Sequence, residues 1–307
     1  MPSQSDRARG VLLGLACGDA LGRPVEFRSA AQIATVHGEL IEMVGDGTWG
    51  QPAGAITDDT AQALCIARSL DARGGFDAAD IAARFLRWLE TEPFDVGRMT
   101  RAALARLRAG EPWQTAGWTV WERAPEGQNA GNGSVMRCAP LALAYHDDPA
   151  RLDAVSVDSS RITHADPRCT VGCAVLNRTI AGLLTDEPRP LEAALADVDE
   201  EVPAALEAAL GGLPDTTDPE ALRTSGYVVT TLQTALYDAL TADAFEAAVV
   251  TSVNRGGDTD TIGAVAGAVA GARFGAAAIP ERWLAVLEGR AELEALADAL
   301  LAQATAG

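Results

Sequence analysis

The chain has 307 residues, of which 48% are hydrophobic and 22% are charged. This is an ordinary globular composition, and it excludes the polar, charge-rich signature of a disordered chain. The 43 acidic residues outnumber the 24 basic residues, all of which are arginine, so the net charge is −19. Such a charge argues against binding along a nucleic-acid backbone, and it favours a monomer.

Membrane and export signals are missing from the sequence. No run of 18 or more strongly apolar residues occurs, which argues against a membrane span. Two arginines near the N-terminus precede only a short apolar run, and that run contains Asp19 where a cleavage site would be needed. We therefore expect a cytoplasmic protein without membrane contact.

The five cysteines are an odd number spread through apolar segments, which is not typical of a disulfide framework. Cys169 and Cys173 are four residues apart and follow His164, so a soft-metal site is one interpretation. A fourth ligand is not evident in the sequence. Two buried thiols on one helix face are therefore the favoured interpretation.

Apolar residues recur every three or four positions along most of the chain, which predicts helices. Two runs of β-branched residues, 227–232 and 248–253, resemble strands, but their apolar residues also follow a helical stripe. We therefore assign them to helices. The predicted helices cover residues 6–20, 58–73, 77–91, 97–109, 133–146, 150–163, 167–184, 191–210, 225–240, 243–254, 259–275 and 281–304.

Small residues dominate the predicted helix 259–275, which allows another helix backbone to approach closely, so we expect this helix to be central and enclosed. Residues 22–56 and 124–133 are rich in Gly, Pro, Asn and Asp, and we expect irregular loops there, of the kind that often carry function. No change of composition marks a linker. The sequence predicts one all-α domain spanning residues 1–307.

Two acidic motifs lie about two hundred residues apart, and each precedes an apolar helix. They are Thr57-Asp58-Asp59-Thr60 and Gly256-Gly257-Asp258-Thr259-Asp260-Thr261. Either motif alone is explained as a helix N-cap, because Asp and Thr oxygens accept the free amides of a first turn. Together, the two motifs contain more carboxylates than capping requires.

If the two helix starts meet, four carboxylates share one pocket. Like charges 4 Å apart repel by about 4 kcal/mol per pair at an effective dielectric constant of 20, so the cluster needs protons or cations. Carboxylate and hydroxyl oxygens are hard ligands that select Mg²⁺, Mn²⁺ or Ca²⁺ over zinc or copper. The number of acids suits two divalent ions, which can hold substrate hydroxyls and activate water.

Several motifs in chain order resemble the ADP-ribosylglycohydrolase family, which includes the dinitrogenase reductase-activating glycohydrolases. The match runs from about residue 7 to residue 275, and its motifs are specific jointly although each is weak alone. The residues that carry it are Gly14-Leu15-Ala16-Cys17-Gly18-Asp19-Ala20-Leu21-Gly22, Glu26, Thr57-Asp58-Asp59-Thr60, Gly131-Asn132-Gly133-Ser134-Val135-Met136-Arg137, His164 and Gly256-Gly257-Asp258-Thr259-Asp260-Thr261.

The resemblance implies a compact orthogonal bundle of many helices with a binuclear Mg²⁺ or Mn²⁺ centre that hydrolyses an ADP-ribose glycosidic bond. Glu26 matches a family glutamate on a mobile loop, where it either ligates a metal or activates water. The implied catalytic residues are Glu26, Asp58, Asp59 and Asp258, and the implied metal ligands are Thr57, Asp58, Asp59, Asp258, Asp260 and Thr261.

The segment 131–137 has two interpretations. Its glycines and Asn132 either expose amides at a helix N-terminus, as an anion site for ribose hydroxyls or diphosphate, or form a Gly-Asn turn with a Ser cap. The resemblance favours substrate binding, through Asn132, Gly133, Ser134 and Met136. Arg137 meets either a phosphate or a surface acid.

Three more residues are candidates for substrate contact. His164 is either a buried polar group or, as the resemblance implies, a histidine at the substrate. Tyr227 either stacks on adenine or belongs to the core. Trp49 lies in the long loop and is a candidate lid residue.

The leading functional interpretation is a hydrolase that removes ADP-ribose from a protein side chain, a nucleic acid or a small molecule. One alternative is a catalytically silent member of the same fold, either an ADP-ribose-binding protein or a structural relative of lens crystallins. All six implied ligands are intact, which argues against this loss. Another is a dinuclear metallohydrolase that acts on a phosphoester.

Overall fold

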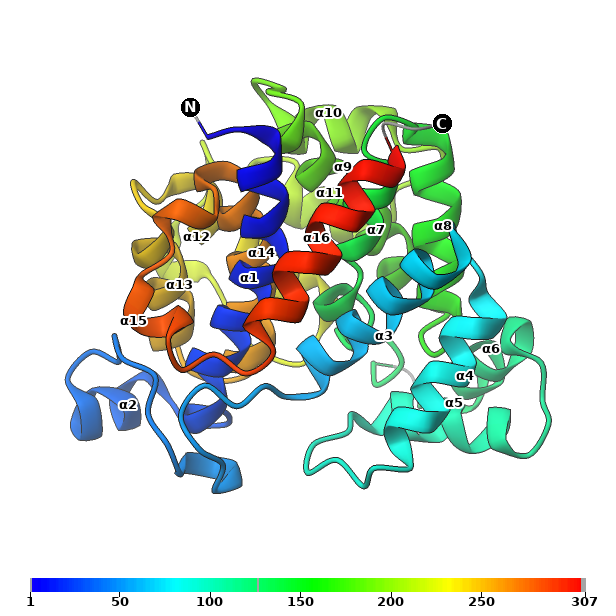
Figure 1. The fold of residues 1–307 in the computed structure, drawn as a ribbon, viewed down its shortest axis with the longest axis horizontal. Helices are drawn as coiled ribbons and strands as arrows, with labels where there is room; N and C mark the ends of the chain where they lie inside the picture. Colours follow the sequence, from blue (N-terminus) through cyan, green and yellow to red (C-terminus); the bar gives the residue numbers. More distant parts are fainter. Residues whose placement is uncertain (1, 126, 305–307) are drawn as a thin grey trace.

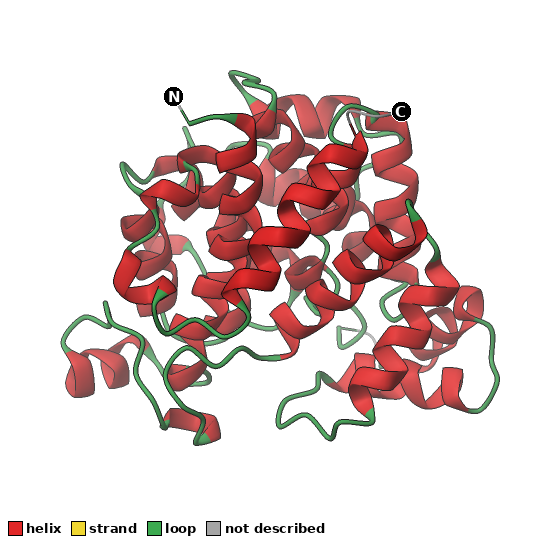
Figure 2. Ribbon diagram, in the orientation of Figure 1, coloured by secondary structure: helices red, strands yellow, loops and turns green. Residues whose placement is uncertain are grey.

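The computed structural model describes residues 2–125 and 127–304, and within these residues the chain folds into helices joined by loops without any strand (Figures 1 and 2). The all-α prediction is confirmed. The helices are α1 (Gln4–Gly22), α2 (Ala30–His37), α3 (Asp58–Arg73), α4 (Ala78–Leu89), α5 (Arg98–Arg108), α6 (Trp113–Arg123), α7 (Pro140–Tyr145), α8 (Pro149–Arg161), α9 (Pro167–Leu184), α10 (Pro190–Asp197), α11 (Ala204–Leu210), α12 (Val228–Thr241), α13 (Phe245–Asn254), α14 (Thr259–Phe274), α15 (Glu281–Leu284) and α16 (Arg290–Ala304).

Helices α1 and α14 form the centre of the molecule. They pack against each other in opposite directions, α12 and α13 cover α14, and α16 crosses α1 (Figure 1). Every residue of α14 from Thr259 to Ala272 is buried, so the expectation of an enclosed helix is confirmed. The α1–α14 contact therefore organises the other layers.

Glycines allow this central contact. On α1 they recur every fourth residue, so they share one face of the helix. A Cβ atom at any of the α1 positions would come closer than 3.0 Å to the backbone of α14, so the two backbones touch. Gly10, Gly14, Gly18 and Gly22 of α1 face Gly271, Gly267, Gly263 and Thr259 of α14.

The segment that follows α1 was predicted to be an irregular loop, but it contains a helix and is held by hydrogen bonds from a buried arginine. Arg23 is fully buried, and its guanidinium donates hydrogen bonds to backbone carbonyls, among them those of Asp46 at 3.1 Å and Pro52 at 3.0 Å. The guanidinium thus holds the loop against the end of α1. The segment also contains α2, which the sequence analysis missed although Ser29 and Gln32 form a capping box at its start.

Three predicted helices have wrong bounds, and one further helix was missed, each for a local reason. The predicted helix 133–146 begins only at Pro140, after a 3₁₀ turn at Val135–Arg137. The predicted helix 191–210 is interrupted before Pro203, and the predicted helix 281–304 is interrupted before Gly289, whose φ is +74°. Helix α6 was not predicted and begins directly after Pro112, which fills its N-cap.

Helices α4, α5 and α6 form a unit beside α3, at the lower right of Figure 1. Helix α4 packs on α3, α5 packs on α4 and α6, and α6 reaches α8. The indole of Trp121 on α6 donates a 2.9 Å hydrogen bond to Asp166, which caps α9. This unit is therefore anchored at both ends.

The cysteines and the hydropathy of the helices bear on two further expectations from the sequence. All five cysteines are buried and free. Among the described residues, the single group of side chains with metal-ligand spacing does not include Cys169 or Cys173. None of the described helices combines the length and the hydropathy that crossing a membrane requires.

We predict that Gly18→Ala lowers the free energy of unfolding by about 1–3 kcal/mol, because the added methyl group forces α1 away from α14. Urea unfolding followed by circular dichroism measures the change. Gly45→Ala is the matched control, since a Cβ there meets its nearest atom at an ordinary 3.4 Å. Equal stability of the two variants would contradict the proposed role of the glycine contact.

Candidate active site

The first turns of α3 and α14 meet the end of α1 at a cavity of about 380 Å³, a volume in the range of small-molecule sites. Polar and acidic side chains come from four separate parts of the chain. The cavity is lined by Glu26, Phe27, Asp58, Asp59, Asp95, Gly97, Arg98, Met99, Thr100, Gly127, Gln128, Ala130, Gly131, Asn132, Gly133, Met136, His164, Gly226, Tyr227, Asp258, Asp260 and Thr261.

The start of α3 is capped by residues other than its two acids. The Thr57 side chain accepts a hydrogen bond from the amide of Asp59, and the buried Asp19 of α1 accepts hydrogen bonds from the amides of Thr57 and Thr60 at 3.0 and 3.1 Å. The amides of Thr57, Asp59 and Thr60 are thus satisfied without the carboxylates of Asp58 and Asp59. Capping therefore does not explain these two acids.

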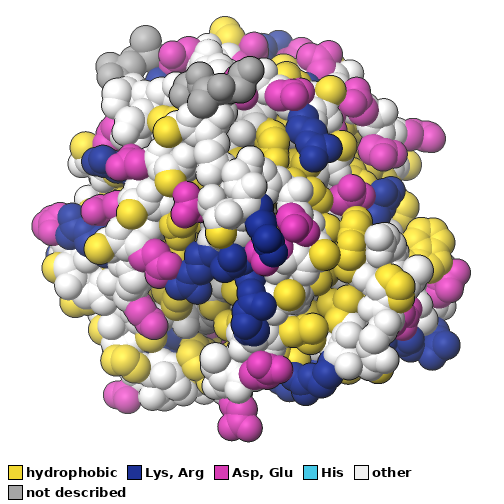
Figure 3. All heavy atoms as spheres, turned by 45° about the vertical axis from the view of Figure 1, so that its right-hand side comes forward, with side chains coloured by type: hydrophobic (Ala, Val, Ile, Leu, Met, Phe, Trp, Pro, Cys, Tyr) yellow, Lys and Arg dark blue, Asp and Glu magenta, His cyan; other side chains and the backbone are white. Residues whose placement is uncertain are grey.

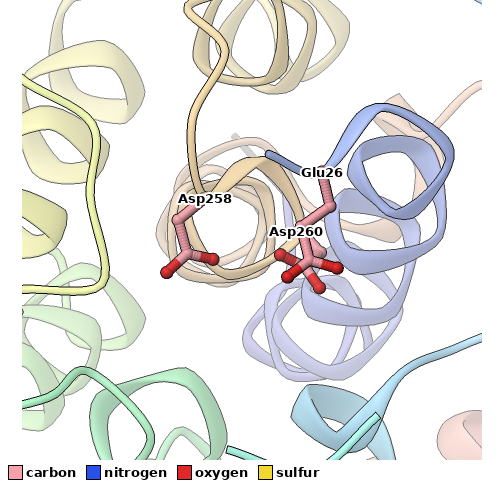
Figure 4. Close-up of side chains that lie close together, drawn as sticks. All are labelled: Glu26, Asp258 and Asp260. Carbon is pink, nitrogen blue, oxygen red and sulfur yellow. The ribbon is translucent and has the colours of Figure 1, made fainter. Parts of the chain in front are cut away.

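The start of α14 repeats this arrangement. Asp258 occupies the N-cap position, yet its side chain makes no capping hydrogen bond and instead accepts one from the Asn132 amide at 2.9 Å. Carboxylate oxygens of Glu26, Asp258 and Asp260 all lie within 4.8 Å of one another. Figure 4 shows the carboxylates of Glu26 and Asp260 pointing toward each other beside that of Asp258.

The two acidic motifs meet in space, as the sequence analysis required. The hydroxyl of Thr261 lies 3.5 Å from Oδ2 of Asp59, although the two residues are 202 positions apart. The other oxygen of Asp59, Oδ1, is buried and has no hydrogen-bond partner among the described residues. Because buried carboxylate oxygens are normally paired, this oxygen is available to a ligand.

The acids of this cluster accept no hydrogen bond from a described guanidinium that would favour their charged forms. Burial, followed by the neighbouring carboxylates, raises the pKa values of Asp58, Asp59 and Asp260 well above the ordinary range. Burial and the charge of Asp95 raise the pKa of Glu26 to about 8. The hydrogen bonds that these acids accept from described side chains come from amide, indole and hydroxyl groups, and none comes from a guanidinium.

Glu26 is held at the cavity by its neighbours. It is 5% exposed, and it accepts a hydrogen bond from the indole of Trp49. The Trp49 ring contacts Phe27 at 6.4 Å and Phe94 at 5.8 Å between centroids, and Phe27 is 68% exposed. Trp49 therefore connects Glu26 to an aromatic cluster whose three rings come from three segments of the chain.

Residues 131–137 do not begin an α-helix, contrary to the sequence prediction. The segment contains a 3₁₀ turn at Val135–Arg137. Three of its amides have acceptors within the protein, because Asn132 donates to the carbonyl of Gly226 at 3.1 Å, and Val135 and Met136 donate to the carbonyl of Asn132. These three amides are therefore not free to bind an anion, and substrate binding by the rest of the segment stays a prediction.

Most of the residues predicted to bind substrate do line the cavity, but Ser134 does not. Asn132, Gly133 and Met136 lie on the wall, whereas Ser134 is buried and accepts a 2.9 Å hydrogen bond from Ser160. Thr57, a predicted ligand, is also absent from the lining, and its hydroxyl lies 3.3 Å from Asp59.

Arg137 meets neither a phosphate nor a surface acid, so both expectations for it were wrong. It is fully buried, its guanidinium lies 4.5 Å from the centre of the Phe85 ring, and it donates hydrogen bonds to Gln62 and Thr163. Gln62 in turn donates to Asp58 at 3.0 Å. Arg137 therefore acts on the site through Gln62, which orients Asp58, and through Thr163, whose hydroxyl lies 2.7 Å from Nδ1 of His164.

His164 and Tyr227 both face the cavity. His164 is 2% exposed, and burial followed by the charge of Arg137 lowers its pKa to about 3, so its ring is neutral at physiological pH. A Cβ at Gly133 would come within 2.8 Å of this ring, which explains the glycine. Tyr227 is only partly buried, and its ring lies 5.5 Å from the guanidinium of Arg168.

Sequence reasoning missed a third acidic segment, which comes from the loop between α4 and α5. Asp95 lines the cavity, and burial together with the charges of Asp19 and Asp258 raises its pKa to about 6. Phe94, Gly97 and Arg98 accompany it. The only signal in the sequence is an aromatic-acid pair followed by glycine before a helix, and nothing in the spacing connects it to the two motifs.

The fold and the cavity define an all-α protein with a buried, oxygen-rich and negatively charged site. A family model described as ADP-ribosylglycohydrolase matches residues 1–307. The chain is 39% identical over 305 residues to the ADP-ribosyl-[dinitrogen reductase] glycohydrolase of Rhodospirillum rubrum, which covers 99% of this chain and 98% of that protein. The chain therefore belongs to the ADP-ribosylglycohydrolase family, and the resemblance in the sequence is confirmed.

Two further comparisons support this membership. The chain is 33% identical over 315 residues to the ADP-ribosylarginine hydrolase Tri1 of Pseudomonas putida GB-1, with 99% of this chain and 80% of that protein covered. A solved structure described as an ADP-ribosylglycohydrolase-related protein complex matches with a TM-score of 0.84 at 39% identity, over 99% of this chain and 100% of that chain.

We predict that the metal-free protein loses stability as pH rises from about 4.5 to about 8, the ordinary and raised pKa values of Glu26. The folded state favours protonated Glu26, so its contribution is complete below the lower value and is lost above the higher one. Urea unfolding in EDTA across this interval measures the effect. Mg²⁺ or Mn²⁺ should make the free energy of unfolding less dependent on pH, and Glu26→Gln should reduce the slope of this dependence. A free energy of unfolding that rises with pH would contradict the raised pKa of Glu26.

Proposed function

We propose that this protein hydrolyses the glycosidic bond between ADP-ribose and an arginine side chain of a modified protein, with the help of two divalent cations, Mg²⁺ or Mn²⁺. One observation carries the proposal. Carboxylates from α3, α14 and the segment after α1 converge on one cavity, where they are buried without a compensating cation from the described residues.

The donor set fits hard divalent cations. It consists of carboxylate and hydroxyl oxygens, and Oδ1 of Asp59 is buried without a partner among the described residues. Cations bound here would neutralise the cluster, hold substrate hydroxyls and lower the pKa of a water molecule. The residues that would hold them are Thr57, Asp58, Asp59, Asp258, Asp260 and Thr261, with Glu26 adjacent.

Two further carboxyl groups are suited to moving protons. Glu26 and Asp95 line the cavity and are not among the six proposed metal ligands, so their carboxyl groups remain available to accept and donate protons. In the reaction, the oxygen of water forms a bond to C1 of the ribose, and the bond from C1 to the arginine nitrogen breaks. One carboxylate accepts the proton of the water, and a proton is returned to the leaving nitrogen.

The cavity entrance suits an arginine acceptor. Phe27 lines the cavity together with Glu26 and Asp95, and Trp49, whose ring contacts those of Phe27 and Phe94, donates a hydrogen bond to Glu26. A guanidinium is planar and cationic, so it is attracted both by aromatic faces and by carboxylates. The name of the Pseudomonas relative, an ADP-ribosylarginine hydrolase, supports the same linkage.

The opposite wall of the cavity suits the nucleotide part of the substrate. Gly131 and Gly133 have no side chains to fill the cavity here, and the neutral ring of His164 lies next to both glycines. Asn132 and Tyr227 also line this part of the cavity, and Tyr227 has an aromatic face. We assign adenine stacking to Tyr227 and ribose contact to Asn132. The substrate then lies with its ADP end at this wall and its acceptor at the aromatic entrance.

A substrate panel tests the proposal. Arginine-linked and serine-linked ADP-ribosyl peptides, O-acetyl-ADP-ribose and an ADP-ribosylated oligonucleotide are incubated with Mg²⁺, Mn²⁺ or EDTA, and the products are separated. We expect ADP-ribose from the arginine linkage only when metal is present. Release of phosphate would indicate a phosphoesterase, and calorimetric binding of ADP-ribose without hydrolysis of any linkage would indicate a silent member of the family.

We predict that Asp258→Ala and Asp260→Ala each lower the hydrolysis rate by at least about 100-fold, because each removes a carboxylate from the proposed metal site. Helical circular dichroism should stay unchanged. Asp71→Ala, which removes an exposed acid from α3, is the matched control and should retain full activity. Near-normal turnover in both site variants would remove the metal assignment.

A further inference from the structure

We propose that a groove between α5 and α6 binds acidic residues that flank the modified side chain in the partner protein. The inference rests on the proposed function, because it concerns the part of the substrate that lies outside the cavity. It would make the enzyme selective for arginines in an acidic sequence context.

The groove is a second hollow of about 400 Å³ that continues from the catalytic cavity. Arg98, Met99 and Gln128 line both hollows, so a chain leaving the cavity on this side passes directly into the groove. The groove is lined by Arg98, Met99, Ala102, Arg106, Thr119, Val120, Arg123, Ala124, Pro125 and Gln128.

Three arginines supply positive charge along the groove. Arg98 and Arg123 are exposed and form no ion pair with any residue that the structure describes. Arg106 forms a 2.9 Å ion pair with Glu111, which also accepts a hydrogen bond from Thr119. The charge of Arg106 is therefore already paired with an acid of the protein. Within the part of the chain that the structure describes, the guanidinium groups of Arg98 and Arg123 thus have no acidic partner.

The charge of this region contrasts with that of the whole chain. Residues 78–123, which span α4 to α6, contain seven arginines and six acids, whereas the whole chain carries −19. On the face that Figure 3 brings forward, several basic side chains lie toward the middle and lower right, with acidic side chains among and around them. An approaching partner with acidic residues is therefore repelled elsewhere and accepted here.

The chemistry of the groove selects a short acidic peptide segment over a nucleic acid. Met99, Ala102, Val120 and Pro125 form an apolar wall that suits the side chains of a peptide. A long polyanion would also extend over the negative remainder of the surface, which opposes it. Carboxylates match the planar donor pattern of guanidinium groups, so one or two Asp or Glu residues satisfy Arg98 and Arg123.

Kinetics with matched peptides test the inference. Three substrates carry ADP-ribose on the same arginine and differ only in flanking residues, which are Asp and Glu, Ser and Gly, or Lys. We expect kcat/KM for the acidic peptide to exceed that for the Ser/Gly peptide by about tenfold at low ionic strength, and high salt to reduce the difference. Arg123→Glu should remove the preference, and free ADP-ribosyl-arginine should be hydrolysed at the wild-type rate.

One variant serves as the control, and a second groove variant tests the inference without adding negative charge. Arg108→Glu changes an exposed arginine of α5 that does not line the groove, so it should keep the preference. Arg106→Gln with Arg123→Gln removes two positive charges without adding negative charge, and it should also abolish the preference. Equal kcat/KM for all three wild-type reactions, or a preference that survives both groove variants, would overturn the inference.

Competition experiments distinguish an acidic peptide from a nucleic acid as the ligand of the groove. An unmodified acidic peptide should inhibit hydrolysis of the acidic substrate, and a single-stranded oligonucleotide of equal charge should inhibit less; stronger inhibition by the oligonucleotide would overturn the assignment to a peptide. If free ADP-ribosyl-arginine is not hydrolysed, the proposed function fails separately. Fluorescence anisotropy of the labelled acidic peptide with wild type and Arg123→Glu then still decides whether the groove binds it.

Discussion

The direct backbone contact between α1 and α14 is the constraint on which the other features depend. A row of glycines on α1 meets glycines on α14, and at the end of the row the hydroxyl of Thr259 donates to the carbonyl of Gly22 at 2.8 Å. This places the first turn of α14 against the residues that leave α1. Glu26 and Asp260 therefore meet because the helix contact brings the end of α1 to the start of α14, and because the segment after α1 pairs with the residues before α14, through hydrogen bonds between Phe27 and Gly257 and between Gly257 and Arg28.

The same helix pair positions the second acidic motif. Asp19, one turn before the end of α1, accepts hydrogen bonds from the first amides of α3 and so fixes its start beside α14. The cost is a concentration of buried carboxylates, whose mutual repulsion and burial disfavour the charged forms. A protein with this arrangement gains stability from whatever neutralises the cluster, so ligand binding and folding are coupled through the same side chains.

The sequence predicted what depends on periodicity and on motifs. The twelve predicted helical segments were placed by apolar spacing, the enclosed helix by its small residues, and the convergence of Asp59 with Thr261 by the surplus of acids at two helix starts. It did not predict Asp95, because a single acid in a short turn is common and its role depends on how α4 and α5 fold back on α3. It misplaced Arg137, because an arginine beside a turn is usually exposed, whereas here Phe85, Gln62 and Thr163 accommodate it in the core.

The interior and the rim of the site carry opposite charges, and this division follows from their elements. The interior is built from helix N-termini, where acids are favoured by the helix dipole before any ligand is present. Part of the rim is built from the outer faces of α5 and α6, where Arg98 and Arg123 lie without ion pairs to described residues. An acceptor with a cationic side chain inside an acidic segment presents the complementary pattern, positive where the cavity is negative and negative where the rim is positive. Selectivity would then come from the order of charges along the substrate, because neither charge alone distinguishes the cavity from the rest of an acidic protein surface.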